Sequence, residues 1–411
     1  MNKVLIISHS WPYFPGPGAE TRAFCLFQQL SQQFDLSFLL PYTLDETKQN
    51  ALSKLGIVHT IKSEKKWQHG EWQLHQIKTK VKQIQPYNPL FQLPQLVESV
   101  KELAVLITDH LKQRGIEHYD LVHLFHPHLA FIFELLKTPL PKTLDWVDER
   151  TSVLEGSQSV NNLNLRQQIK INLEIKRLKR YQQAISKLFD ASYVSSTIDA
   201  KRLYQFTQVC PLVVPNGVDT DYFHLLPNSS KSTTLVFSGY MGYEPNANAV
   251  VYFCKEVLPL IKQRVPDIRL VIVGMDPTPE VIALAEKYPN HVTVTGKVDD
   301  VRPYFTEAVL SVVPLRIGGG TRLKILESLA MGRPVITTTI GCKGLAVEDE
   351  KHLLIRDNAQ SFAEAVVRLL KDGTVRQNLV KQGRQLVEVK YSWSHIAQTV
   401  AHNWRHLIEK N

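Results

Sequence analysis

The feature that most constrains the fold is a long alternation of short apolar runs with helical patterns. In the second half of the chain the apolar runs lie near residues 234–238, 269–273, 291–295, 310–315 and 334–339. These runs are almost continuously apolar, which is typical of parallel strands buried on both faces of a sheet. Because helical patterns separate them, the sequence predicts a doubly wound α/β architecture.

The first half begins in the same way but is less regular. The predicted strands are Lys3–Ser8, Leu36–Leu40, Leu121–Phe125 and 142–147, and the predicted helices are 19–33, 96–114 and 164–187. Residues 62–95 are rich in Lys, Gln, His and Pro and predict an insertion with short helices. A Pro-Asn-Gly turn within residues 213–223 separates the two halves. Two doubly wound α/β domains are therefore expected, with a deep ligand-binding cleft between them.

Composition narrows the class of protein. A chain of 411 residues with 44% hydrophobic residues can bury more than one core. The formal charge of +9 leaves nucleic acid, anionic lipid and phosphorylated substrates open as partners. The four cysteines are scattered, so neither a disulfide framework nor a zinc site is indicated. With no predicted signal peptide or membrane span, we expect a cytoplasmic protein, soluble or peripheral at the inner face of the membrane.

One stretch, residues 311–341, predicts an anion site. A buried strand leads into a turn with three consecutive glycines (318–320), and a helix is expected from about Thr321 to Met331. Free backbone N–H groups at a helix N-terminus attract phosphate. Lys324 and Glu327 lie three residues apart on one helix face, which suits a nucleotide diphosphate with its ribose further along the helix. The alternative is a surface helix with an ordinary Lys–Glu pair.

Several motifs together resemble one family. They are PNGVDTDYF, FSGYMGYEPNANAV, VTVTGKVDDVRPYF, GGGTRLKILESLAMGRPVITTTIG and YSWSHIA. With these motifs the chain resembles the retaining glycosyltransferases of family 4, which have the GT-B fold of two facing Rossmann-like domains. The resemblance implies an acceptor-side domain at 1–213, a nucleotide-sugar domain at 214–391, and a last helix at 392–411 that packs back on the first domain.

The same resemblance implies a donor site. Glu327 matches the glutamate that holds the ribose hydroxyls, and Arg322 and Lys324 take the diphosphate role found in a branch with a GGGTR-x-K loop. Gly319 stands where the family often has a second glutamate, and the usual Arg and Lys are missing from SGYMGY. The implied donor-binding set is Gly239, Lys297, Gly318, Gly319, Gly320, Thr321 and Glu327.

Three histidines surround the end of the predicted strand at Leu121–Phe125. His123 lies inside the strand pattern and is interpreted as a core residue. His126 lies at the carboxyl end, where parallel sheets present active groups. In the family that the chain resembles, a histidine near this position approaches the donor sugar, so His126 is favoured as the catalytic histidine over His128 or neither of the two. A zinc site is disfavoured because no acidic or cysteine partner has a ligand spacing.

Residues at other strand and helix ends are candidates for the acceptor side, and the resemblance implies that the loop at Gly18 borders the donor phosphate and the acceptor. They are Gly18, Glu20, Arg22, Asp148 and Arg150. For Asp148 and Arg150 a plain ion pair is the alternative. Asp219 and Asp221 mimic a metal-binding Asp-x-Asp motif, but their position in a turn favours a structural role. No metal or other cofactor is expected.

The expected activity is metal-independent transfer of a sugar from a nucleotide-diphosphate sugar to a glycan, lipid-linked or other hydroxyl acceptor in polysaccharide or glycoconjugate biosynthesis. The alternatives are a sugar-nucleotide epimerase of the same fold and a non-catalytic nucleotide- or carbohydrate-binding subunit. Nucleic-acid binding is disfavoured because the basic residues lack aromatic interleaving. Basic residues at 166–187 and 62–82 predict reversible contact with an anionic membrane, and a solvated helix face is the alternative.

Overall fold

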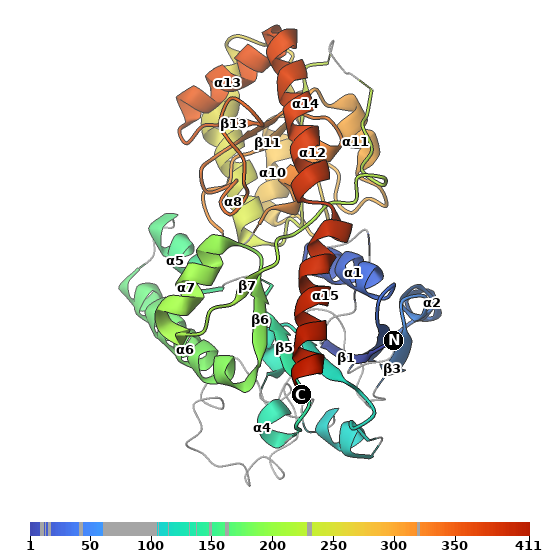
Figure 1. Cartoon of the computed structure of the whole chain (residues 1–411). Coiled ribbons are helices and arrows are strands. Elements are labelled where there is room, and N and C mark those ends of the chain that lie inside the picture. The colour runs from blue at the N-terminus through green and yellow to red at the C-terminus, as the bar shows by residue number, and fades with distance from the viewer. Residues whose placement is uncertain are drawn as a thin grey trace. The chain divides into compact units, whose positions relative to one another are not determined.

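The computed structural model describes residues 1–8, 12, 14, 18–40, 44–60, 105, 107–113, 115–130, 132–136, 138–147, 150–160, 164–227, 232–318 and 321–411. The chain divides into two compact units (Figure 1). Unit 1 comprises Met1–Gln158, Asn162–Val214 and Ala397–Asn411, and unit 2 comprises Ser159–Asn161 and Pro215–Ile396. The main boundary, after Val214, lies one residue from the expected one.

Unit 1 contains a parallel sheet of seven strands in the order β3-β2-β1-β4-β5-β6-β7. The strands are β1 (Lys3–Ser8), β2 (Asp35–Leu40), β3 (Ile57–Thr60), β4 (Leu121–Phe125), β5 (Lys142–Asp145), β6 (Ala191–Val194) and β7 (Leu212–Val213). Every residue of β4 is buried, as the apolar pattern predicts. β5 ends two residues earlier than expected because Val147 adopts φ 63° and its N–H bonds the Asp145 carboxylate at 2.8 Å.

The helices of unit 1 connect these strands. They are α1 (Gly18–Leu30), α2 (Glu46–Ser53), α4 (Ile132–Leu135), α5 (Arg150–Val160), α6 (Leu165–Ile185) and α7 (Thr197–Thr207). Helix α6 begins with a capping box, in which Asn164 and Gln167 exchange side-chain and backbone hydrogen bonds. The predicted insertion at 62–95 and most of the predicted helix at 96–114 lie outside the described residues, although 107–113 are helical.

The last helix, α15 (Trp393–Lys410), belongs to unit 1 from Ala397 onward. Trp404 is fully buried and packs edge-on against Phe34. Asn403 accepts a hydrogen bond of 2.7 Å from the Tyr193 hydroxyl. These contacts fix the helix to the first unit.

Unit 2 contains a second parallel sheet, of six strands in the order β10-β9-β8-β11-β12-β13. The strands are β8 (Thr234–Ser238), β9 (Arg269–Val273), β10 (Val292–Val294), β11 (Leu310–Val313), β12 (Val335–Thr337) and β13 (Leu354–Ile355). β11 ends earlier than predicted because Pro314 has no N–H to donate to the ladder. The helices are α8 (Glu244–Tyr252), α9 (Leu258–Lys262), α10 (Pro279–Lys287), α11 (Arg302–Glu307), α12 (Leu323–Ala330), α13 (Ala359–Lys371) and α14 (Gly373–Lys390).

Both sheets reverse their strand order at one point, between β1 and β4 in unit 1 and between β8 and β11 in unit 2. Open α/β sheets bind ligands at the carboxyl ends of the strands beside such a reversal. The segments that follow these four strands are therefore where each unit's site is to be sought. None of the described helices is long and apolar enough to cross a membrane.

Candidate functional site

In unit 2 the strand-order reversal is framed by Gly239, directly after β8, and by the loop from β11 to α12. Helix α12 buries Ile325, Leu326 and Leu329 against the unit's core. Its other face carries Lys324 and Glu327, and both side chains are partly exposed. The amphipathic pattern thus positions a cation and a carboxylate at the carboxyl edge of the sheet, as the sequence predicts.

The start of α12 differs from the prediction by two residues. The helix begins at Leu323, and Arg322 is the N-cap residue with extended backbone. Thr321 is held outside the helix because its hydroxyl accepts a hydrogen bond from the Asn216 backbone N–H at 3.3 Å and its carbonyl accepts one from Asn216 Nδ2 at 3.1 Å. The Thr321 side chain is buried, so it serves the turn rather than presenting a free hydroxyl. Arg322 therefore lies before the first turn of α12 rather than within it.

Lys324 is held by partners from the first helix and strand of unit 2. Its Nζ donates to Asn246 Oδ1 at 2.7 Å and lies 4.1 Å from the ring centroid of Phe237. Burial, reinforced by the Arg322 charge, lowers the pKa of Lys324 to about 7, while Glu327 opposes the shift. A lysine with this pKa gains charge when an anion binds beside it.

Glu327 lies one turn further along α12. Burial raises the pKa of its carboxyl to about 7, and the nearby Lys324 charge counteracts that rise. Among the described residues its carboxylate forms no side-chain hydrogen bond or ion pair. Lys324 donates to Asn246 rather than to Glu327, so the ordinary Lys–Glu pair of the alternative interpretation does not form. The carboxylate remains available as an acceptor for a ligand.

Two glycines make room for these cations. A Cβ on Gly239, which has φ 155°, would lie 2.5 Å from Lys324 Nζ and 2.8 Å from Asn246 Nδ2. A Cβ on Gly318, at φ 143°, would clash with the Arg322 guanidinium. Gly319 and Gly320 lie outside the described residues. Lys297 is exposed and follows β10, the outer strand, which β9 separates from β8.

In unit 1 two strained residues follow neighbouring strands at the carboxyl edge. His126 follows β4 with φ 77°, and its N–H bonds the Asp145 carbonyl at 3.1 Å. Val147 follows β5 with φ 63°, a conformation that branched residues rarely adopt. Strained backbone of this kind clusters at functional sites. The His126 ring lies 5.9 Å from that of His128.

The expectation for His123 is confirmed. The side chain is fully buried, and its Nδ1 lies 2.9 Å from the Thr143 hydroxyl. Burial, with a smaller effect of Arg22, lowers the pKa of His123 to about 3. It is a neutral core histidine at physiological pH.

The expectation that Arg22 faces an acceptor is wrong. Its guanidinium is fully buried and donates to Asp145 Oδ2 through Nε at 3.1 Å and Nη2 at 2.9 Å. The two charges lie 123 residues apart in sequence, so the pattern of α1 alone could not reveal the pair. Gly18 is exposed and Glu20 partly exposed at the start of α1. Asp148 lies outside the described residues, and Arg150 begins α5.

The structural interpretation of Asp219 is confirmed. Its carboxylate accepts hydrogen bonds from the backbone N–H groups of Asp221 at 3.0 Å and Tyr222 at 2.9 Å, which is a turn geometry. Within the described ranges no three His, Cys, Asp or Glu side chains come together as a set of metal ligands.

Sequence reasoning missed three residues that support the site. Asn246 positions Lys324 and also donates through Nδ2 to the Tyr240 carbonyl at 2.8 Å. Asn216 fixes Thr321, as described above. Arg316, in the β11–α12 loop, donates to Asn248 Oδ1 and stacks over Tyr252 at 4.5 Å. The sequence offered one signal for these residues, the pair of asparagines at the start of α8. Asparagine side chains compete for backbone hydrogen bonds inside a helix, so an asparagine there that does not cap the helix is expected to have another role.

Comparison with known proteins finds similarity to glycosyltransferases. A family model described as "Glycosyl transferases group 1" matches residues 232–372, all within unit 2. A phosphatidyl-myo-inositol mannosyltransferase of Mycobacterium tuberculosis is 26% identical over 199 residues, covering 46% of this chain and 52% of the relative. The chain thus spans about half the length of the curated relatives it matches.

Solved structures match the whole chain. A sucrose-phosphate synthase from Thermosynechococcus elongatus superimposes with a TM-score of 0.73 at 17% identity and covers 100% of both chains. Anabaena Alr3699/HepE, solved with UDP-glucose, gives a TM-score of 0.66 at 12% identity and covers 98% of this chain and 99% of its own. With the two parallel sheets, these matches define the two-domain Rossmann-like fold of GT-B glycosyltransferases.

Proposed function

We propose that the protein is a retaining glycosyltransferase that moves a sugar from a nucleotide-diphosphate donor to a hydroxyl acceptor in glycoconjugate biosynthesis. The observation that carries this proposal is the polar face of α12, beside the strand-order reversal of unit 2. There Lys324, which Asn246 holds in place, lies one turn from Glu327, whose carboxylate forms no ion pair among the described residues. The family match over residues 232–372 supports the activity. The similarity to a structure solved with UDP-glucose supports the class of donor.

In this proposal Glu327 accepts hydrogen bonds from the ribose hydroxyls. Lys324 and Arg322 face the diphosphate at the start of α12, together with the backbone around Gly318. Negative charge grows on the departing diphosphate as the C1–O bond breaks, so these cations act most strongly in the transition state. With retention, the leaving phosphate accepts the proton of the acceptor hydroxyl on the same face of the sugar.

For unit 1 we propose that the carboxyl edge around His126 serves the sugar or the acceptor. The strained backbone of His126 supports this role, since such strain persists only where the surroundings enforce it. The name of the mycobacterial relatives supports a lipid-linked hydroxyl among the candidate acceptors. His126→Ala should lower the turnover rate while nucleotide diphosphate binding stays intact, and His128→Ala is the matched comparison.

A two-stage experiment tests the proposal. Thermal-shift screening of nucleotide sugars first identifies the donor, because a ligand that binds the folded state raises Tm. Release of nucleotide diphosphate from that donor is then measured with and without acceptor, in the presence of a chelator. Acceptor-dependent release supports the transferase. Binding without release identifies a non-catalytic subunit, and release of an epimerised donor identifies an epimerase.

A further inference from the structure

Helix α6 buries side chains in unit 1 only along its second half. Its first half meets α5 through hydrogen bonds that Gln158 Nε2 donates to the Gln168 carbonyl at 3.4 Å and to Asn172 Oδ1 at 3.0 Å. Its buried residues are Ile175, Tyr181, Gln182 and Ile185. The Tyr181 hydroxyl donates to the Pro127 carbonyl at 2.6 Å, directly after His126. Lys179 is tied to Glu155 of α5 at 3.1 Å. The first half, from Leu165 to Glu174, contains no buried residue. The C-terminal half of the helix is therefore fixed to unit 1, and no side chain of its N-terminal half is buried.

That exposed half carries an apolar stripe. Leu165, Ile169 and Leu173 are spaced by four residues, which places them one above another on a single helix face. Their exposed fractions are 71%, 51% and 49%. Three large apolar side chains aligned in water mark an interaction site rather than the usual scattered surface residues.

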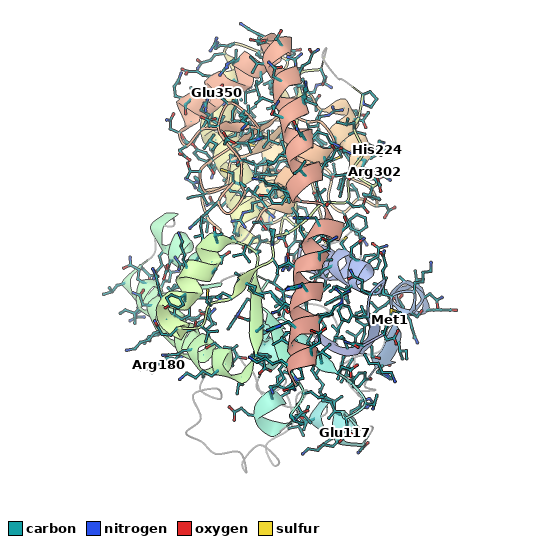
Figure 2. The ribbon with its side chains drawn as sticks, viewed as in Figure 1. Met1, Glu117, Arg180, His224, Arg302 and Glu350 are labelled. Carbon is teal, nitrogen blue, oxygen red and sulfur yellow. The ribbon has the colours of Figure 1, made fainter. Side chains whose placement is uncertain are left out.

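Cations continue and flank the same stripe. Lys176 and Arg180 follow at the next two positions of this face, and both are exposed. Figure 2 shows Arg180 at the outer surface of α6. Arg166, Lys170 and Arg177 lie beside the stripe, and Glu174 is the helix's one acid. Among the described residues none of these five cations forms an ion pair.

We propose that this face of α6, defined by Leu165, Ile169, Leu173, Lys176 and Arg180, docks on an anionic lipid bilayer. The apolar side chains enter the boundary between headgroups and acyl chains, and the cations meet the anionic headgroups. If a second copy of the chain docked here, the five cations of α6 (Arg166, Lys170, Lys176, Arg177 and Arg180) would face the same five cations of that copy. An anionic bilayer offers the opposite charge instead, so charge complementarity favours the bilayer. Because Tyr181 ties α6 to the segment after His126, docking holds the carboxyl edge of unit 1 close to the lipid surface.

This inference concerns the partner of the proposed transferase but has its own measurement. The protein is sedimented with vesicles of neutral phosphatidylcholine, with or without anionic phosphatidylglycerol. Binding is expected to anionic vesicles at low salt, and to weaken toward about 1 M salt, where the Debye length falls to about 3 Å. The triple variant Leu165→Gln/Ile169→Gln/Leu173→Gln should lose at least about tenfold in partition coefficient. Lys176→Gln/Arg180→Gln should lose about fivefold for each cation removed.

Matched controls separate this face from general surface properties. Ile57→Gln/Ile282→Gln changes apolar residues that are 64% and 46% exposed elsewhere, and Lys54→Gln/Lys201→Gln removes two exposed cations. Both controls should bind like the parent, with an unchanged Tm. If the triple and double variants also bind like the parent, the proposal is overturned. A dimer that the triple variant dissociates while vesicle binding persists would overturn it in favour of a second copy.

Lys324→Ala distinguishes the docking face from the proposed function. This variant should keep full vesicle binding while it loses turnover, and the α6 triple variant should keep turnover with a water-soluble acceptor. Loss of turnover in the α6 variant with its Tm intact would contradict a purely docking role for this face. If the parent protein does not bind anionic vesicles, the docking proposal is wrong and the proposed transferase activity is unaffected.

Discussion

Lys324 Nζ lies 2.7 Å from Asn246 Oδ1, although the two residues are 78 positions apart in the chain. Asn246 is itself fixed by its hydrogen bond to the Tyr240 carbonyl, and the Phe237 ring lies beneath the ammonium group. The amine is therefore positioned before any donor arrives. Preorganised charge of this kind stabilises a transition state without reorganisation at the moment of reaction.

The first prediction concerns Asn246 as a positioning residue. Asn246→Ala removes the acceptor that favours the protonated amine, so the pKa of Lys324 should fall further below its usual range. Turnover should drop by about tenfold, the scale of one hydrogen bond to a charged group. The limb of the pH–rate profile that belongs to Lys324 should move to lower pH. A drop in rate with an unmoved profile would assign Asn246 a merely structural role.

The pH dependence of nucleotide diphosphate binding is the second prediction. In the free protein the pKa of Lys324 and that of Glu327 are both about 7. Binding of the diphosphate requires protonated Lys324, so affinity should fall as pH rises above about 7, by up to tenfold per unit. The ribose hydroxyls require ionised Glu327, so affinity should also fall below that pH. The two limbs belong to a coupled pair.

Single variants assign those limbs. Glu327→Gln should abolish the acidic limb, and the remaining alkaline limb should move to lower pH because the carboxylate no longer supports the Lys324 charge. Lys324→Met should abolish the alkaline limb. Titration of the diphosphate itself is common to all variants and cancels in the comparison. Parallel pH profiles for the parent and both variants would contradict the assignment.

The third prediction concerns Gly239. Gly239→Ala places a methyl group 2.5 Å from Lys324 Nζ and should displace the amine, lowering turnover toward the level of Lys324→Ala. The matched control is Gly296→Ala, which also has positive φ but has nothing within 4 Å of the new Cβ. The control should lose stability by about 1 kcal/mol and retain turnover. Equal losses of turnover in both variants would mean that backbone strain, rather than the clash, is responsible.

Sequence patterns predicted the longer strands well. Four strands match the expected ranges: Lys3–Ser8, Leu121–Phe125, Thr234–Ser238 and Arg269–Val273. Each contains an apolar run between polar or glycine boundaries, which only His123 interrupts. The short strands β3, β6, β7 and β13 were not expected. They have only two to four residues and include partly or fully exposed ones, so their apolar signal is weak.

The candidate site was predictable only within α12. The spacing of Lys324 and Glu327 places both on the partly exposed face, as local helix geometry requires. The preference of Lys324 for Asn246, and the ion pair of Arg22 with Asp145, depend on which distant segments the sheet brings together. No local sequence pattern encodes either contact. The sequence therefore makes Arg22 a candidate for the acceptor side, whereas the structure places it in the core.

That buried ion pair gives the fourth prediction. Asp145→Leu removes the carboxylate that accepts from the buried Arg22 guanidinium and should destabilise the protein by about 3–5 kcal/mol. It also removes the acceptor for the Val147 N–H. Arg22→Met/Asp145→Leu should recover part of that loss, because no buried charge remains unpaired. Chemical denaturation measures both, and a double variant less stable than the single one would contradict this account of the pair.

The most direct test of the donor site is a calorimetric titration of the parent, Glu327→Ala and Lys324→Ala with the nucleotide diphosphate of the donor identified by screening, beside steady-state rates. Glu327→Ala should weaken binding by about 1.5–3 kcal/mol, the scale of hydrogen bonds to a charged group. Lys324→Ala should lower turnover by roughly 10²–10³, more than it weakens binding. The two losses need not add, because the residues are neighbours. If Glu327→Ala binds the diphosphate as tightly as the parent, the donor site does not lie on α12.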